Sequence, residues 1–179
     1  MFGYNFAMDI AREFIEEISP FCEIPPEIVG SLRRKCTQVN DIDILAMPKF
    51  NYTPDDTLFG TITKLNALDS KLAEMCFNNE MKLEMNGEKI KRFSHFSDSG
   101  TMIDLYLATK ENLPTLRLIR TGSYNHIVRL CERARIWQMH LQADGTGLFD
   151  AQFHPLKVES EEDIFRLLGL PYLEPEKRI

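Results

Sequence analysis

Two carboxylates stand one residue apart in an apolar segment of this chain. Asp41 and Asp43 occur in the run DIDILAM at 41–47, where period-two alternation predicts a strand with both carboxylates on one face. A third acidic residue, Asp104, stands in the similar run TMIDLYLA at 101–108. Unpaired carboxylates among apolar side chains are costly, and hard cations such as Mg²⁺ prefer clustered oxygen ligands. Three such carboxylates indicate a site for two Mg²⁺ ions, which suits phosphoryl or nucleotidyl transfer.

The Asp-x-Asp pair has a second interpretation when it is taken alone. An exposed strand start for the first carboxylate, and an arginine partner for the second, would explain it without a metal, since short motifs recur by chance. The preceding segment GSLRR favours the metal interpretation. Gly30 and Ser31 would form a small anion cradle at a helix start, and the cations of Arg33 and Arg34 follow at once. Donors for a triphosphate and metal-binding carboxylates thus occur within fourteen residues.

Composition narrows the class of protein. The chain has 179 residues, of which 44% are hydrophobic and 27% charged, so we expect one ordinary domain or two small lobes. With a net charge of −6, the chain does not have the overall positive electrostatic field of a strong nucleic-acid binder. Five arginines nevertheless occur within 116–135. Four scattered cysteines without a CxxC pair indicate free thiols in a reducing cytoplasm. We see neither a signal peptide nor an apolar run of membrane-spanning length.

The predicted fold class is α+β, a mixed α/β arrangement. Helical spacing of apolar residues predicts helices at 8–18, 61–77, 121–135 and 160–168, and alternation predicts strands at 41–47 and 102–107. Asn86-Gly87 predicts a hairpin, whose Lys89, Lys91 and Arg92 we interpret as water-facing, with a DNA-backbone contact as the alternative. We expect a palm-like mixed sheet in residues 1–110 and a smaller lobe in 111–179.

The motifs together resemble a known family. Gly30-Ser31-x-Arg33-Arg34, Asp41-x-Asp43 and the later strand with Asp104 are similar to the palm of the DNA polymerase beta (family X) nucleotidyltransferases. Thr121-Gly122-Ser123 looks like the family's thumb-side motif, and EEDIFRLLGLPYLEPEKR at 161–178 looks like its C-terminal signature. The resemblance covers nearly the whole chain from Gly30. Its small size resembles the minimal stand-alone forms found in viruses and phages.

The resemblance implies roles for individual residues. It makes three aspartates the catalytic residues and the ligands of two Mg²⁺ ions, for which Mn²⁺ is an expected substitute: Asp41, Asp43 and Asp104. It implies that Gly30, Ser31 and Arg34 bind the phosphates of the nucleotide. It also implies that Gly122 and Ser123 border the sugar, through a turn that is often cis in the family. We expect nucleic-acid contacts along a basic groove between the lobes: Arg120, Arg129 and Arg133.

The implied function is transfer of a nucleotide from a (deoxy)nucleoside triphosphate to a nucleic-acid 3′-hydroxyl. The chain would be a minimal DNA polymerase for gap filling and repair, a monomer acting on a DNA primer and template, with RNA also open. It would work in the cytoplasm, that of the host if the chain is viral, with no membrane partner. The chain has Ile119-Arg120 where the family usually places an aromatic residue, which leaves the choice of sugar open.

Two alternatives remain at this point. One is a nucleotidyltransferase acting on RNA or tRNA ends or on a protein hydroxyl. The other is an inactive nucleic-acid-binding module that keeps the fold. The catalytic hypothesis requires the carboxylates at 41, 43 and 104 to converge on shared cations, and a guanidinium in that space would speak against it.

Overall fold

A five-stranded mixed sheet forms the centre of the protein. The computed structural model describes residues 1–54 and 62–178. The strand order is β2-β4-β9-β8-β7, in which β4 and β9 run parallel and the other neighbours antiparallel. The strands are β2 (Glu27–Ile28), β4 (Asp41–Ala46), β7 (Lys82–Asn86), β8 (Ile90–Ser94) and β9 (Met102–Leu107). The predicted strands at 41–47 and 102–107 and the Asn-Gly hairpin are therefore present.

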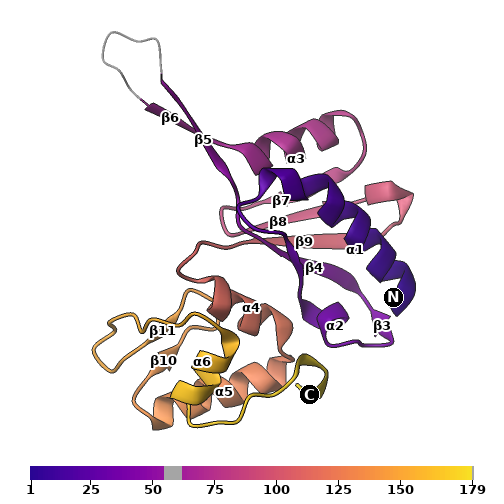
Figure 1. The fold of residues 1–179 in the computed structure, drawn as a ribbon. Coiled ribbons are helices and arrows are strands. Elements are labelled where there is room, and N and C mark those ends of the chain that lie inside the picture. The colour runs from indigo at the N-terminus through magenta and orange to yellow at the C-terminus, as the bar shows by residue number, and fades with distance from the viewer. Residues whose placement is uncertain (55–61, 179) are drawn as a thin grey trace.

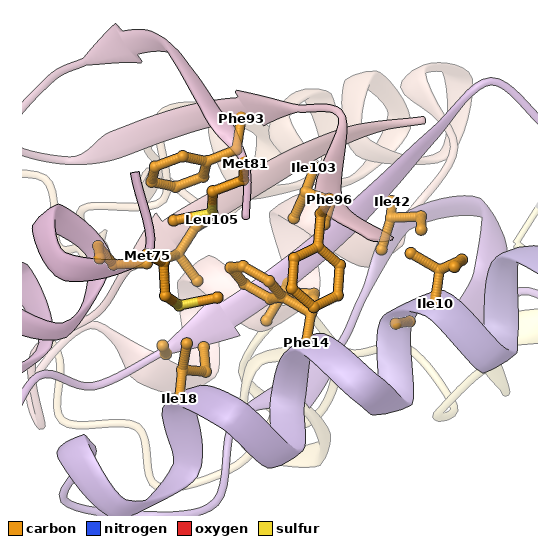
Figure 2. Close-up of a cluster of buried hydrophobic side chains, with 14 of the residues drawn as sticks. Ile10, Phe14, Ile18, Ile42, Met75, Met81, Phe93, Phe96, Ile103 and Leu105 are labelled. Atoms are coloured by element: carbon orange, nitrogen blue, oxygen red, sulfur yellow. The ribbon is translucent and has the colours of Figure 1, made fainter. Parts of the chain in front are cut away.

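One face of the sheet carries the hydrophobic core. Helices α1 (Tyr4–Ile18) and α3 (Ala67–Phe77) lie on this face (Figure 1). Ile10, Phe14 and Ile18 recur at helical spacing along α1 and point toward the sheet, where they meet side chains such as Phe93 and Ile103 (Figure 2). Burying each large apolar side chain of this kind contributes about 1.5–3 kcal/mol to the stability of the fold, so this core holds α1 and α3 against one face of the sheet.

The opposite face of the two central strands carries the acidic residues. Because strand side chains alternate, burying Ile42 and Ile44 in the core turns Asp41 and Asp43 to the other side. The same alternation on β9 buries Ile103 and Leu105 and turns Asp104 to the side of Asp43, its register partner. The pattern that buries the core therefore gathers the carboxylates on the face not covered by α1 and α3.

The C-terminal part of the chain packs around a second core. Its elements are α4 (Leu113–Thr121), α5 (Tyr124–Ile136), β10 (His140–Leu141), β11 (Leu148–Phe149) and α6 (Glu161–Leu167). Leu118, Leu130, Ile164 and Phe165 are among its buried residues. A third apolar cluster joins the two parts and includes Val29, Leu45, Tyr106 and Leu116. The predicted α+β fold class with a mixed sheet and a small C-terminal lobe is confirmed.

Several short elements complete the fold. They are β1 (Phe2–Gly3), α2 (Gly30–Arg33), β3 (Gln38–Val39), β5 (Phe50–Pro54), β6 (Ile62–Asn66) and the 3₁₀ helices Ser19–Phe21, Phe96–Asp98 and Pro175–Lys177. β5 and β6 pair antiparallel and project from the rest of the molecule as a two-stranded arm (Figure 1). No helix of the described part of the chain is long and apolar enough to cross a membrane.

Three predicted helices start more than one residue from the predicted position, and the helix expected over 8–18 begins earlier, at Tyr4. The helix expected over 61–77 is a strand up to Asn66, after which α3 begins; Thr61 itself lies outside the described residues. Asn66 caps α3 by accepting a hydrogen bond from the backbone N–H of Asp69 at 3.2 Å, which explains the later start. The helix expected over 121–135 begins at Tyr124, because Ser123 is its N-cap. The preceding helix, α4, was not predicted.

A buried ion cluster ties the two parts of the protein together. Glu161, at the start of α6, accepts paired hydrogen bonds from Arg33 of α2 at 2.7 and 2.9 Å and from Arg178 at 3.1 and 3.0 Å. The side chains of Glu161 and Arg178 are 3% and 0% exposed. Burial alone would raise the pKa of Glu161, but the two guanidinium groups lower it to about 2. This carboxylate therefore stays ionised and connects α2, α6 and the C-terminal segment.

We predict that Glu161→Ala destabilises the fold by about 3–5 kcal/mol, because it leaves two guanidinium groups without their buried partner. Equilibrium unfolding in urea measures the change. Glu162→Ala, at the exposed neighbouring position, is the matched control and should change stability by less than about 0.5 kcal/mol. An equal effect of the two substitutions would contradict the role given to Glu161.

Candidate active site

Gly30 lies directly against one of the predicted metal ligands. The pairing of β2 with β4, and a hydrogen bond from the Val29 N–H to the Asp43 carbonyl at 2.9 Å, place it there. Its backbone has a φ of +63°, and a Cβ added to it would lie 1.9 Å from Oδ2 of Asp43. Glycine is thus required both by the left-handed backbone and by the carboxylate beside it.

The next residue presents an unpaired hydroxyl. The side-chain oxygen of Ser31 is buried and has no hydrogen-bond partner within the described residues. Buried polar groups are nearly always hydrogen-bonded in folded proteins, so an orphaned hydroxyl here indicates a group that binds at this point. The phosphate contact of Ser31 remains a prediction, which this unpaired hydroxyl supports.

The three aspartates share one face of two neighbouring strands. Asp43 and Asp104 are direct register partners across the parallel pair, and Asp41 lies two residues earlier on β4. Burial, followed by repulsion from Asp41 and Asp104, raises the pKa of Asp43 from 3.8 to about 7. Tyr106 partly offsets this by donating a hydrogen bond to Oδ1 of Asp43 at 3.2 Å. The hydrogen bond from Tyr106 therefore does not compensate the negative charge of the three aspartates on this face of the sheet.

A guanidinium engages the third carboxylate, which the sequence interpretation missed. Arg92 on β8 is the register partner of Asp104, and its Nε and Nη2 donate to the two oxygens of Asp104, each at 2.6 Å. The hairpin cations are thus not simply water-facing: Arg92 is in an ion pair and Lys91 is buried, with only 8% exposed. As the side chains lie, no three acidic, histidine or cysteine residues of the described chain converge closely enough to hold a metal ion.

The donor set nevertheless fits a site for hard divalent cations. It consists of carboxylate oxygens on adjacent strands, and burial together with the neighbouring acids raises the pKa of Asp43 to about 7. Asp43 and Asp104 lie side by side as the hypothesis requires, but Asp104 must exchange at least part of its contact with Arg92 to ligate an ion. A guanidinium among the carboxylates was expected to speak against the catalytic hypothesis. Arg92 is such a group, and it binds Asp104, one of the three predicted ligands.

The Thr-Gly-Ser motif forms the joint between α4 and α5 and is clamped from α2. Thr121 accepts a hydrogen bond from Arg33 at its hydroxyl (2.6 Å) and one from Arg34 at its carbonyl (2.5 Å), and Arg34 also reaches the carbonyl of Gly122 at 3.2 Å. Ser123 accepts from the N–H of His126 at 3.2 Å as the cap of α5. Arg34 is thus placed beside the motif predicted to border the sugar. Among the described residues no peptide bond is cis, so the turn expected to be cis is trans.

Arg120 borders a cavity of about 750 Å³ on the C-terminal lobe. The cavity is also lined by Gly122, Tyr124, Arg135 and His140. The guanidinium of Arg120 lies 4.4 Å from the centre of the Tyr106 ring, the same tyrosine that contacts Asp43. Arg120 therefore stands between the carboxylate face and this cavity, at the sequence position where the family resemblance implies an aromatic residue.

The other two predicted nucleic-acid contacts, Arg129 and Arg133, lie on α5, whereas Arg120 lies on α4. Arg129 is exposed, and Arg133 donates from Nε to the carbonyl of Leu168 at 2.9 Å. Neither lines the cavity beside Arg120, where Arg135 stands instead. A helix turns about 100° per residue, so the rotation of α5, which the sequence leaves open, decides which arginines share a face. Contacts of Arg129 and Arg133 with nucleic acid remain predictions.

Comparisons with known proteins define the class. The family model of the DNA polymerase beta thumb matches residues 116–179. The crystal structure of Leishmania infantum polymerase beta, a ternary P/T complex, superposes with a TM-score of 0.77 at 18% identity and covers 99% of this chain and 76% of that one. The fold is thus that of polymerase beta, with a palm-like sheet that carries the aspartates and a thumb-like lobe.

Curated proteins of similar sequence include polymerases and a nucleotidylexotransferase. Repair DNA polymerase X of African swine fever virus (isolate Warthog/Namibia/Wart80/1980) is 28% identical over 153 residues, which are 84% of this chain and 79% of the relative. The DNA nucleotidylexotransferase of Xenopus laevis is 38% identical over 77 residues, 42% of this chain and 15% of that protein. The chain is thus similar in sequence to family X polymerases, in agreement with the resemblance of its motifs.

We predict that Gly30→Ala disturbs the site as well as the backbone. The left-handed conformation costs an alanine about 1–3 kcal/mol, and its Cβ also displaces the Asp43 carboxylate. Gly100→Ala is the matched control, because its φ of +67° is similar and its Cβ would meet nothing within 4 Å. Urea unfolding should show a loss for both variants, while Mn²⁺ affinity should fall only for Gly30→Ala. Equal Mn²⁺ affinity of the two would contradict the contact.

Proposed function

We propose that this protein is a minimal DNA polymerase that transfers a nucleotide from a deoxynucleoside triphosphate to the 3′-hydroxyl of a DNA primer, with two Mg²⁺ ions. The observation that carries the proposal is the register pairing of Asp43 with Asp104 on the open face of the sheet, beside the Gly30-Ser31 cradle. The viral relatives named as repair polymerases support gap filling and repair as its task.

The residues of the site divide the work as follows. Asp41, Asp43 and Asp104 hold the cations, which, once bound, lower the pKa of the attacking hydroxyl and neutralise charge on the leaving pyrophosphate. Ser31 offers a free hydroxyl for the phosphate tail. Arg34 adds positive charge beside the cradle. Its present hydrogen bonds end on the carbonyls of Thr121 and Gly122, which brings the phosphate side and the sugar side of the pocket together.

The choice of sugar depends on the residues at the motif that joins α4 and α5. Gly122 and Ser123 border the sugar in this proposal, and a Cβ on Gly122 would approach Ile127 Cδ1 to 2.6 Å, so the backbone there is closely packed. Arg120 replaces the family's aromatic residue and packs on Tyr106. We propose deoxynucleotides as the substrate, since the viral relatives are DNA polymerases, and ribonucleotide use is an outcome that the assay below distinguishes.

The remaining parts of the proposal concern the lobes, the partners and the location of the protein. The palm comprises residues 1–110 and the nucleotide- and DNA-contacting lobe 111–179, in keeping with separate cores in the two parts. The protein acts as a monomer on a DNA primer and template. It works in the cytoplasm, that of the host if the chain is viral, and the four free cysteines support a reducing compartment. Arg120, Arg129 and Arg133 contact the nucleic acid, and Mn²⁺ replaces Mg²⁺.

We predict that Asp43→Asn and Asp104→Asn each lower the rate of Mg²⁺-dependent primer extension by at least about a hundredfold. Asp9→Asn, an exposed residue of α1, is the matched control and should keep the wild-type rate. The assay offers dNTPs or NTPs on gapped DNA, DNA primers and RNA primers. Wild-type rates in both site variants would refute the mechanism. A preference for ribonucleotides on RNA would favour the alternative substrate, and no binding of a metal-nucleotide complex would favour an inactive binding module.

We also predict a pH dependence of metal binding set by Asp43. Its folded pKa is raised above the unfolded value, so the proton stabilises the metal-free fold below about pH 4 and this contribution is lost as the pH rises through about 7. A cation needs the ionised carboxylate, so Mn²⁺ affinity should fall at most about tenfold per pH unit below about 7 and level off above it. Calorimetric titrations between about pH 5.5 and 8 test this. Asp43→Asn should remove the dependence, and constant wild-type affinity would contradict it.

A further inference from the structure

We propose that Arg92 competes with the catalytic cation for Asp104, so that metal loading of the site is an exchange of a guanidinium for an ion. The inference rests on the proposed function, since it assumes that Asp104 is a metal ligand. It adds a residue on a strand that carries none of the predicted site residues.

The first step of the argument is the geometry of the pair. A carboxylate offers about four lone-pair positions, and the guanidinium fork takes one on each oxygen of Asp104, at 2.6 Å in both cases. The fork is planar and fixed by the register of β8 with β9, in which Arg92 is opposite Asp104. Both oxygens are therefore turned toward β8, whereas a shared ion would lie on the side of Asp43, on β4.

The second step is the charge of the site. Arg92 compensates one of three neighbouring carboxylates. Asp43, the register partner of Asp104, accepts a hydrogen bond from the uncharged Tyr106 hydroxyl at 3.2 Å, so repulsion between the two neighbouring acids persists. A divalent ion between Asp43 and Asp104 would relieve this repulsion, but it would also repel the guanidinium. The ion and Arg92 therefore oppose each other's binding at Asp104, and such coupling is reciprocal.

The third step is the environment of the two partners. The side chain of Asp104 is 4% exposed, whereas that of Arg92 is 38% exposed. Arg92 can turn into solvent without leaving a buried charge unpaired, while Asp104 stays in place and is left with a free oxygen for the ion. The pair is thus one in which the cation is replaceable and the carboxylate is fixed.

The consequence is that the site has a low affinity for a free metal ion, because the ion must displace Arg92 from Asp104. A metal-nucleotide complex supplies the ion together with phosphates, which bind at the Gly30-Ser31 cradle. In this proposal Arg92 is a positioning residue that lowers affinity for the free ion, and it is not itself a ligand.

Mn²⁺ binding to the full-length protein without nucleotide or DNA tests the proposal, by electron paramagnetic resonance and calorimetry. We expect Arg92→Gln to bind Mn²⁺ about fivefold or more tightly than wild type, the lower end of ordinary coupling between sites. Arg92→Lys, which keeps the charge but loses the fork, should lie between the two. Arg12→Gln removes the same charge from an exposed site on α1 and is the matched control, with wild-type affinity expected.

The double variant Arg92→Gln/Asp104→Asn assigns the gain to the carboxylate. Its affinity should equal that of Asp104→Asn alone, because the competition disappears with the shared ligand. Thermal unfolding with and without Mn²⁺ provides a second readout, in which Arg92→Gln should be stabilised by the ion more than wild type.

Failure of this proposal and failure of the proposed function give different results. If Asp104→Asn weakens Mn²⁺ binding but Arg92→Gln binds no more tightly than wild type, the competition is refuted and the metal site stands. Weaker binding in Arg92→Gln would mean that the arginine supports the ligand, which also overturns the competition. If Asp104→Asn binds Mn²⁺ as wild type does, the metal role of Asp104 fails, and both proposals fail with it.

Discussion

Repulsion among three carboxylates on one face of a sheet is the constraint that the surrounding structure accommodates. The parallel pairing of β4 with β9 makes Asp43 and Asp104 register partners, and the backbone ladder does not let them separate. The neighbouring groups all respond to this charge. Gly30 leaves room for one carboxylate, Tyr106 donates to it, and Arg92 pairs with the other. A cation is the one addition that would satisfy all three acids at once.

The short helix α2 links this charge to the C-terminal lobe. Its first residue touches Asp43, Arg33 reaches Glu161 of α6, and Arg34, next in the chain, holds the carbonyl of Thr121. A displacement of the lobe must therefore act on the residues beside the carboxylates. This connection explains why a motif of five residues, GSLRR, serves structure as well as chemistry: one of its arginines is committed to an ion cluster and the other to the joint between two helices.

The arginine-rich segment also has a structural role that its charge alone conceals. Arg117 pairs with Glu27 of β2, and Arg133 holds the end of α6 through the carbonyl of Leu168. Arg120 packs on Tyr106. Several arginines of this segment therefore join structural elements in a protein whose net charge is −6. The basic surface available to a polyanion is smaller than the number of arginines in the segment suggests.

The sequence by itself determined the α+β class, the central strands and the acidic face, because alternation along a strand is a local property that burial of Ile42 or Ile103 enforces. It also indicated the resemblance to family X polymerases, since the spacing of Gly30, Ser31 and the aspartates can be recognised in the sequence without the structure. Only the tertiary structure decided which cations meet which acids. Arg92 reaches Asp104 through a strand register, and Arg33 meets Glu161 across 128 positions. The packing of α4 and α5 places Arg120 and Arg135, but not Arg129, at one cavity. These contacts depend on strand register and on the packing of one element against another, which the pattern within a single element does not specify.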